Sequence, residues 1–481
     1  MKIRSWITAS LTAISSAAIG QPTVAQPTTP HPRLIVLTDI EADPDDTQSL
    51  IRLLLYANEI DLEGLVATTS VHQKARLAPE SIRRLIGEYE KVRPNLVRHD
   101  PGFPTADTLS RMIDTGQPGY GMAAIGPGKD TPGSRRIIAA LDRRDDRPLW
   151  VAGWGGPNTL AQALLTLRAT RSPAELKRLV AKLRLYTVSD QDDSGPWIRR
   201  EFPDLFYIVS PGGYGAATWS GINTVVDGID NSTISNPWLA ANIQQGRGPL
   251  GAAYPDVAYG MEGDTPTFLG LIPNGLNMPD RPDWGGWGGR YTLRMPARAE
   301  LDPTGFNGGV PVPAETRPIW TNAIDTVTPV VVNAYGRATK PMERSYRGFR
   351  ETLWRWRDDF QNDFAARMQW TYRTPGDVNH PPVVVLPHSD RLAVRSGATV
   401  QLSALGTRDQ DGDSLSYRWF QYREAGTCGD IALSSTENLY ERSFRAPPVT
   451  RTCDAHFVLA VTDRGTPPLT RYRRVIVTVG P

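Results

Sequence analysis

An acidic segment that directly follows a buried strand constrains this 481-residue chain more than any other feature. Residues 34–37 are four consecutive apolar residues, a pattern typical of a strand buried on both faces. Five carboxylates then fall within the eight positions 39–46. Residues 44–58 predict an amphipathic helix, with Asp43 at its N-cap and Pro44 at its first position. The acids therefore lie at the carboxyl end of a strand, where open α/β sheets bind ligands.

The helix dipole explains only part of this acidity. Asp45 and Asp46 in the first helical turn would complement the dipole, at about 0.3–1 kcal/mol each. Asp39 and Glu41 precede the helix, and clustered carboxylates repel one another unless a cation or shared protons relieve them. Oxygen ligands favour a hard cation, so the segment predicts a metal site that takes Ca²⁺ ahead of Mg²⁺.

Charge and the N-terminal segment narrow the class of protein. The 53 basic and 51 acidic residues give a net charge of +2, which provides no field for nucleic acid or an anionic membrane. Residues 1–25 have a basic start, a short apolar stretch and a small-residue cleavage site, which together predict a signal peptide. No later segment reaches the length of a membrane span. We expect a secreted or periplasmic protein, and the sequence leaves its oligomeric state open.

Strand, loop and helix alternate from residue 32 to about residue 170, which predicts a mostly parallel open sheet with helices on both faces. Polar side chains follow several of the expected strands, so we expect a site assembled from several loops. A lone histidine is more often structural, and an Asp-rich turn can simply cap a helix. The candidates in these turns are His72, Asn158, Thr159, Asp192, Asp193 and Trp197.

Later segments add four more candidates. Glu262 and Asp264 precede a Thr-Pro helix start, and Trp284 and Trp287 lie in a glycine-rich loop. Exposed tryptophan faces stack on sugar rings, so this loop could form a sugar platform. The alternative is a tryptophan pair packed beneath the loop. A long helix is expected over residues 344–370.

A second domain is expected over residues 379–481, because short β patterns separated by turn residues replace the alternation of strands and helices. The spacing predicts an immunoglobulin-like β-sandwich. Its turn at residues 409–413 resembles turns of polycystic-kidney-type and cadherin-like modules. Cys428 and Cys453 can pair there in an oxidising compartment, and two reduced buried thiols are the alternative.

The acidic segment resembles the Asp-x-Asp-x-x-x-Asp-Asp motif of nucleoside hydrolases, with Glu41 at the second acidic position. The order of motifs is similar to that of nucleoside hydrolase-like proteins of the secreted bacterial cellulose-binding type. This resemblance implies a nucleoside hydrolase-like α/β domain over residues 26–378. It assigns water activation to Glu41 and a sugar hydroxyl to Asp45. The metal site that we expect contains Asp39, Glu41, Asp46, Asp264 and the Thr159 carbonyl.

Two functions are consistent with these residues. The first is a Ca²⁺-dependent hydrolase of N- or O-glycosyl bonds, with Glu41 and Asp45 as catalytic residues. The alternative is a non-catalytic carbohydrate- or cellulose-binding protein that retains the hydrolase fold. A metal-dependent phosphatase would need basic residues around the phosphate. We expect glycans to be preferred over purine nucleosides, with Glu262 or Asp193 as the acid. The expected substrate-binding residues are Asp45, His72, Asn158, Asp192, Asp193, Trp197, Glu262, Trp284 and Trp287.

Overall fold

The computed structural model describes residues 30–211, 217–301, 310–332, 338–341, 344–434 and 439–481. The predicted signal peptide at residues 1–25 lies outside the described residues. Within the described part of the chain, no helix is both long enough and apolar enough to cross a membrane.

An eight-stranded sheet forms the centre of the described α/β region, with the strand order β3-β2-β1-β4-β5-β6-β8-β7. All neighbouring strands in it are parallel except β7, which pairs antiparallel with β8 at one edge. The prediction of a mostly parallel sheet is therefore confirmed. The strands are β1 (Arg33–Thr38), β2 (Asp61–Ala67), β3 (Ile113–Thr115), β4 (Leu149–Gly153), β5 (Leu183–Thr187), β6 (Phe206–Val209), β7 (Tyr291–Arg294) and β8 (Ile319–Asn322).

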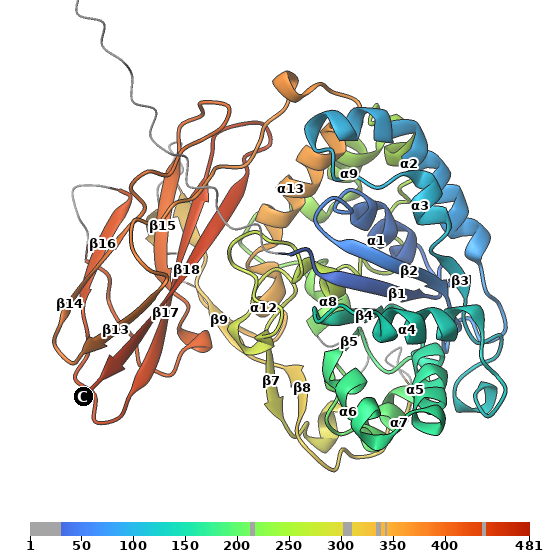
Figure 1. The fold of residues 1–481 in the computed structure, drawn as a ribbon. Helices are drawn as coiled ribbons and strands as arrows, with labels where there is room; N and C mark the ends of the chain where they lie inside the picture. Colours follow the sequence, from blue (N-terminus) through green and yellow to red (C-terminus); the bar gives the residue numbers. More distant parts are fainter. Residues whose placement is uncertain (1–29, 212–216, 302–309, 333–337, 342–343, 435–438) are drawn as a thin grey trace, which may run out of the picture. The chain divides into compact units, whose positions relative to one another are not determined.

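Helices cover both faces of this sheet (Figure 1). Leu34 and Val36 of β1 belong to a hydrophobic cluster with residues of α1, α2 and α13, whereas Ile35 and Leu37 belong to one with residues of α4 to α7. The apolar run thus fills two cores, one on each face. The helices are α1 (Asp45–Leu54), α2 (Pro79–His99), α3 (Ala106–Ser110), α4 (Pro132–Asp142), α5 (Asn158–Thr170), α6 (Pro173–Lys182), α7 (Ser194–Glu201), α8 (Ala217–Gly221), α9 (Asn236–Leu239), α10 (Gly248–Ala252), α11 (Pro266–Leu269), α12 (Glu351–Trp354) and α13 (Arg357–Gln369).

The register of the strands brings their carboxyl ends to one edge of the sheet. Thr38 at the end of β1 is paired with Ala67 at the end of β2, and Leu37 is paired with Gly153 at the end of β4. Gly153 in turn is paired with Thr187 at the end of β5. The loops that carry most of the candidate residues therefore start next to one another.

The C-terminal part contains a four-stranded sheet, β13-β18-β17-β15, and a two-stranded sheet, β14-β16. Side chains from both sheets share one hydrophobic cluster, as in a sandwich. Cys428 and Cys453 form a disulfide with a Cα–Cα distance of 5.1 Å, so the predicted pairing is confirmed. The strands are β13 (Arg391–Arg395), β14 (Thr399–Ser403), β15 (Ser416–Gln421), β16 (Glu441–Arg445), β17 (Cys453–Thr462) and β18 (Thr470–Gly480).

The single helix expected over residues 344–370 is wrong at its N-terminal end. Strand β12 (Tyr346–Gly348) pairs antiparallel with β9 (Asp325–Val327), and helix begins only at Glu351. Cross-strand pairing outweighs the helix propensity of this segment. Another short pair, β10 (Val330–Val332) with β11 (Ala338–Pro341), also went unpredicted.

The expected domain boundary at residue 379 divides the polypeptide but not its hydrophobic core. Tyr472 of β18 belongs to the same cluster of buried residues as Trp287 and Phe360. On α13, Asp359 accepts a hydrogen bond from the Tyr472 hydroxyl, and the Asp363 carboxylate lies 2.6 Å from an Arg471 guanidinium nitrogen. The last helix of the α/β region and the last strand of the sandwich are therefore joined by buried polar contacts as well as by aromatic packing.

Candidate functional site

Four buried aspartates lie around the carboxyl edge of the main sheet. Asp39 directly follows β1, Asp45 and Asp46 begin α1, and Asp264 precedes α11. Each is at most 4 % exposed. Together with the half-buried Asp43, they are called the acidic cluster below.

The carboxylates of the acidic cluster interact electrostatically. Those of Asp43, Asp45 and Asp46 each offer an oxygen within 4.8 Å of the others. Burial raises the pKa of Asp264 well above its usual value, and the charges of Asp45, Asp46 and Asp39 raise it further. Burial likewise raises the pKa of Asp39 to about 7. Negative charge concentrated in this way requires a bound cation or shared protons.

Local hydrogen bonds fix the orientation of three of these carboxylates. The Thr38 hydroxyl donates to Asp46 Oδ1, which ties the start of α1 to the end of β1. The backbone N–H of Asp45 donates to Asp43 Oδ1 at 2.9 Å. The Trp219 indole N–H donates to Asp45 Oδ2 at 2.8 Å. The cluster is therefore built from oriented side chains.

Trp219 is a site residue that the sequence analysis missed. Its indole lies against Gly260 and Gly263, where an added Cβ would collide with the ring. A Cβ at Gly263 would also lie 2.6 Å from Asp45 Oδ2. The only sequence signal was the pair of glycines three residues apart, which by itself does not identify the side chain that they accommodate.

The glycine-rich turn after β4 lies between Asp39 and Asp192. A Cβ at Gly155 would lie 2.9 Å from both Asp39 Oδ1 and Thr68 Oγ1. A Cβ at Gly156 would collide with Asp192 Oδ2. Asp192 is fully buried, and burial raises its pKa to about 7. Glycine at both positions lets the two carboxylates approach the turn from opposite sides.

Bare polar atoms accompany these carboxylates. Asp264 Oδ2 and Asp192 Oδ2 are buried and have no hydrogen-bond partner among the described residues. Buried polar atoms are normally satisfied, so such atoms point to a ligand, an ion or ordered water. The oxygen-only donors of the acidic cluster fit a hard divalent cation of the Ca²⁺ type. Further bare atoms at these strand ends are Thr68 Oγ1, Asn158 Oδ1 and Ser189 Oγ.

Two of the expected metal ligands are engaged elsewhere. Glu41 has a φ of 83°, and its carboxylate accepts hydrogen bonds from Arg76 and Ser81. Thr159 lies in the first turn of α5, where its carbonyl follows the helix axis away from the strand ends. Its hydroxyl accepts a hydrogen bond from the backbone N–H of Gln117 at 3.1 Å. Asp39 occupies the place in the cluster that the resemblance gave to Glu41.

Glu262 forms a buried ion pair. Its carboxylate lies 2.5 Å from Arg52 Nε of α1 and accepts hydrogen bonds from Tyr254 at 2.6 Å and from Thr265 at 2.9 Å. Its backbone has a φ of 50°, which is unusual for a non-glycine residue. These contacts hold the loop that carries Asp264 against the helix that carries Asp45.

Three other expected sugar-binding residues take varied positions. Asn158 Nδ2 donates to the Gly119 carbonyl at 2.9 Å, and Asp193 Oδ1 accepts from the backbone N–H of Met122 at 2.7 Å. Both bonds attach the glycine-rich loop after β3 to the strand-end loops. The backbone N–H of His72 donates to Ser70 Oγ at 3.0 Å, in a turn directly after β2.

The structure does not bring the expected tryptophans to the acidic cluster. Trp287 is fully buried and contacts Tyr472 of the sandwich, to which its N–H donates at 3.3 Å. Trp284 is also buried and packs edge-on against His456. Trp197 packs against Phe202 on α7. Trp284 and Trp287 thus lie packed beneath their loop, as in the alternative considered above.

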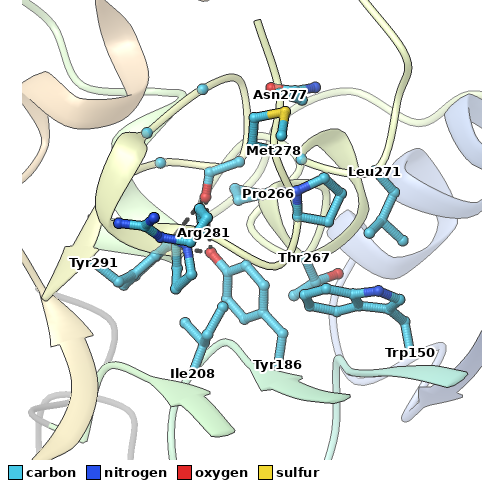
Figure 2. A pocket seen from close by; sticks show the side chains of 17 residues that line it. Trp150, Tyr186, Ile208, Pro266, Thr267, Leu271, Asn277, Met278, Arg281 and Tyr291 are labelled. Carbon is cyan, nitrogen blue, oxygen red and sulfur yellow. Dashed lines mark hydrogen bonds between the residues drawn. The ribbon is translucent and has the colours of Figure 1, made fainter. Parts of the chain in front are cut away.

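A separate small cavity of about 40 Å³ lies on one face of the sheet, and Figure 2 shows its lining. Trp150 and Tyr186 lie opposite Met278 there, and the hydroxyls of Tyr186 and Tyr291 are hydrogen-bonded to each other. No carboxylate lines the cavity. It is therefore distinct from the acidic cluster.

Comparison with protein families gives two matches. The family described as "Cellulose-binding Sde182, nucleoside hydrolase-like domain" matches residues 33–291, which include the whole acidic cluster. The family described as "Cellulose-binding protein Sde0182, C-terminal domain" matches residues 399–479. Among curated proteins, none matches this chain.

Comparison with solved structures gives one extensive match. A nucleoside hydrolase-related protein from Saccharophagus degradans, described as associated with carbohydrate metabolism, is 35 % identical with a TM-score of 0.76. The match covers 94 % of this chain and 100 % of that protein. The effector protein XOO4466 is 13 % identical with a TM-score of 0.27, covering 60 % of this chain and 87 % of its own.

Proposed function

Because this chain belongs to the nucleoside hydrolase-like family of cellulose-binding Sde182, we propose that its acidic cluster binds Ca²⁺ together with a carbohydrate and hydrolyses a glycosyl bond. The observation that carries the proposal is the convergence of four buried aspartates at the strand edge where α/β sheets bind ligands. The bare Asp264 Oδ2 supports it further.

Asp39, Asp46 and Asp264 are the residues that would hold the cation, with Asp43 beside them. Burial and mutual repulsion raise the pKa of Asp46 and Asp264, so a cation at this point would relieve a cost that the fold otherwise bears. When bound, Ca²⁺ supplies positive charge that fixes sugar hydroxyls and a water molecule. Asp45, held by Trp219, would orient a sugar hydroxyl.

Asp39 and Asp192 are the residues that would move protons. The water oxygen bonds to the anomeric carbon while Asp39 takes its proton, and the bond to the leaving group breaks as Asp192 supplies a proton to that group. Burial raises the pKa of each to about 7, which suits proton transfer near neutral pH. These roles replace Glu41 as base and Glu262 or Asp193 as acid, because Glu41 and Glu262 are in ion pairs.

A carbohydrate-binding protein without turnover is the second candidate function. Glu41 and Glu262, two carboxylates expected to move protons, are both paired with arginines. Such pairing favours the ionised, acceptor-only form and removes the general-acid role. Export of the protein belongs to the same proposal, supported by residues 1–25 and by the cellulose-binding description of the family.

The test is calorimetric titration of the full-length protein with cello- and xylo-oligosaccharides and with inosine, in Ca²⁺ and in chelator, combined with product analysis. We expect glycan binding that requires Ca²⁺ and Asp46, and cleavage that is lost in Asp39→Asn while binding persists. Glycan binding without any cleavage would select the second candidate. Inosine cleavage without glycan binding would overturn the preference for glycans, and binding that is indifferent to both Ca²⁺ and Asp46→Asn would overturn the site.

A further inference from the structure

Three polar residues converge where the chain enters the C-terminal sandwich. Asn379 lies at the start of this region, Asp409 lies in the turn after β14, and Asp463 lies in the loop between β17 and β18. We propose that these three residues form a second divalent-cation site, selective for Ca²⁺-type ions and separate from the acidic cluster.

Each of the two aspartates has one saturated oxygen and one bare oxygen. Asp463 Oδ1 accepts hydrogen bonds from Asn379 Nδ2 at 2.9 Å and from the backbone N–H groups of Gly465 at 3.1 Å and Leu469 at 2.9 Å. Asp409 Oδ1 accepts from the backbone N–H groups of Asp411 at 2.8 Å and Asp413 at 3.0 Å. The second oxygen of each carboxylate is buried without a hydrogen-bond partner among the described residues.

Asn379 repeats the pattern with an amide. Its Nδ2 donates to Asp463 Oδ1 and to the Pro467 carbonyl at 2.8 Å. Its Oδ1 is buried and bare within the described part of the chain. Asn379 and Asp463 are only 6 % and 3 % exposed. All the N–H donors at this junction are thus used on one side, which leaves three oxygens for a ligand.

The packing around Asn379 supports a built site. An added Cβ at Gly465 would collide with the Asn379 amide, so glycine at this position lets the amide approach the loop after β17. Burial raises the pKa of Asp463 to about 6, and the charge of Asp409 raises it further, which places the two carboxylates close together. Two carboxylates brought together with an amide oxygen match the hard ligands of Ca²⁺.

The neighbouring acids have other partners. The exposed Asp411 carboxylate accepts from the His380 backbone N–H at 2.6 Å, and it lies 3.0 Å from His380 Nδ1. Asp430, elsewhere in the sandwich, pairs with Arg423 at the surface. Asp430→Asn is therefore a matched control that removes an acidic charge from the sandwich without touching the proposed site.

The experiment compares full-length wild type with Asp463→Asn in equilibrium dialysis against Ca²⁺ and in thermal unfolding. Asparagine at 463 keeps the Oδ1 acceptor and replaces the bare oxygen by an NH₂ group. We expect one bound ion fewer per chain than in wild type, or at least a tenfold weaker site. We also expect loss of the Ca²⁺-dependent rise in melting temperature that belongs to this site. In chelator the variant should be at least as stable as wild type, because a buried bare carboxylate has been removed.

Two further variants keep the outcome decisive. Asp46→Asn should leave the ion that Asp463→Asn loses, which separates this site from the acidic cluster and from the proposed function. Asp409→Asn repeats the test if Asp463→Asn does not fold. The proposal is overturned if Asp463→Asn and Asp409→Asn both bind as many ions as Asp430→Asn, with equal affinity and equal stabilisation. That result would assign the bare oxygens to ordered water.

Discussion

Arg52 and Glu262 form an ion pair buried between helix α1 and the loop before α11, with 2.5 Å between Arg52 Nε and Glu262 Oε2. Neither side chain is exposed. Because α1 carries Asp45 and Asp46 and the loop carries Asp264, this contact determines how the two halves of the acidic cluster face each other.

We expect Glu262→Gln to destabilise the fold by about 3–5 kcal/mol, because removal of one partner leaves a buried charge uncompensated. Arg52→Gln combined with Glu262→Gln should recover part of that loss. Denaturant unfolding measures both changes. As a control, Asp283→Asn breaks the surface pair with Arg281 and should cost at most about 1 kcal/mol. A cost for Glu262→Gln as small as that of the control would contradict this account.

Asp46→Asn should remove most of the stabilisation that Ca²⁺ provides through the acidic cluster. A ligand at 100 times its Kd stabilises by about 2.7 kcal/mol, so the wild-type melting temperature should rise measurably on addition of Ca²⁺. In chelator, Asp46→Asn should be no less stable than wild type, since it removes a repelling charge. Asp107→Asn at the surface serves as the control. An undiminished Ca²⁺ response in Asp46→Asn would show that this carboxylate is not a ligand.

Stability in chelator should fall as the pH rises from about 4 to about 7. Aspartate in the unfolded chain has a pKa of about 3.9, whereas burial raises the pKa of folded Asp39 and Asp192 to about 7. Between these values the folded state binds more protons, so the free energy of unfolding decreases with pH. Ca²⁺ should flatten the dependence, because it favours the ionised carboxylates. Chemical denaturation at pH 5 and pH 8 measures it, and a rise in stability over this range in chelator would contradict the prediction.

Gly155→Ala and Gly156→Ala should disrupt the candidate site. The added methyl groups would meet the side chains of Asp39 and Asp192, which must then move. We expect loss of glycan binding and a destabilisation of about 1–3 kcal/mol from overpacking. Gly87→Ala on α2 is the matched control, since nothing lies within 4 Å of its new Cβ. It should stabilise by about 0.5–1 kcal/mol. Normal binding by both Gly155→Ala and Gly156→Ala would place the sugar elsewhere.

Truncation after Asp377 should abolish soluble protein. The loss of residues 378–481 would uncover Trp287 and Trp356, which pack on Tyr472, and would remove Arg471 from Asp363. Soluble yield and dispersion of the NMR spectrum measure the outcome. A folded, monodisperse fragment would instead show that the boundary expected at residue 379 is also a folding boundary.

Much of the fold could be predicted from local patterns. Residues 34–37 indicate a doubly buried strand, and Pro173 to Lys182 forms the helix expected there, with Ser172 as its N-cap. These elements depend on their own residues. The short strands from β9 to β12 could not be predicted, because they exist only through pairing with distant partners.

The candidate site was predictable in part for the same reason. Asp39, Asp46 and Asp264 follow or precede elements that the sequence marks clearly. The direction of the Glu41 side chain depends on Arg76 and Ser81, which come from the loop after β2 and from α2. Trp219 reaches Asp45 from 174 positions along the chain. Side-chain direction and long-range contact are not encoded in spacing.

The core shared across residue 379 limits how this chain can recombine with others. A C-terminal segment transplanted alone would carry Tyr422 and Tyr472 to its surface, together with Arg471 lacking its partner Asp363. Such a surface would be adhesive in a new host. The transferable unit therefore includes helix α13 and its aspartates, and gene fusions that inherit the sandwich without them should be selected against.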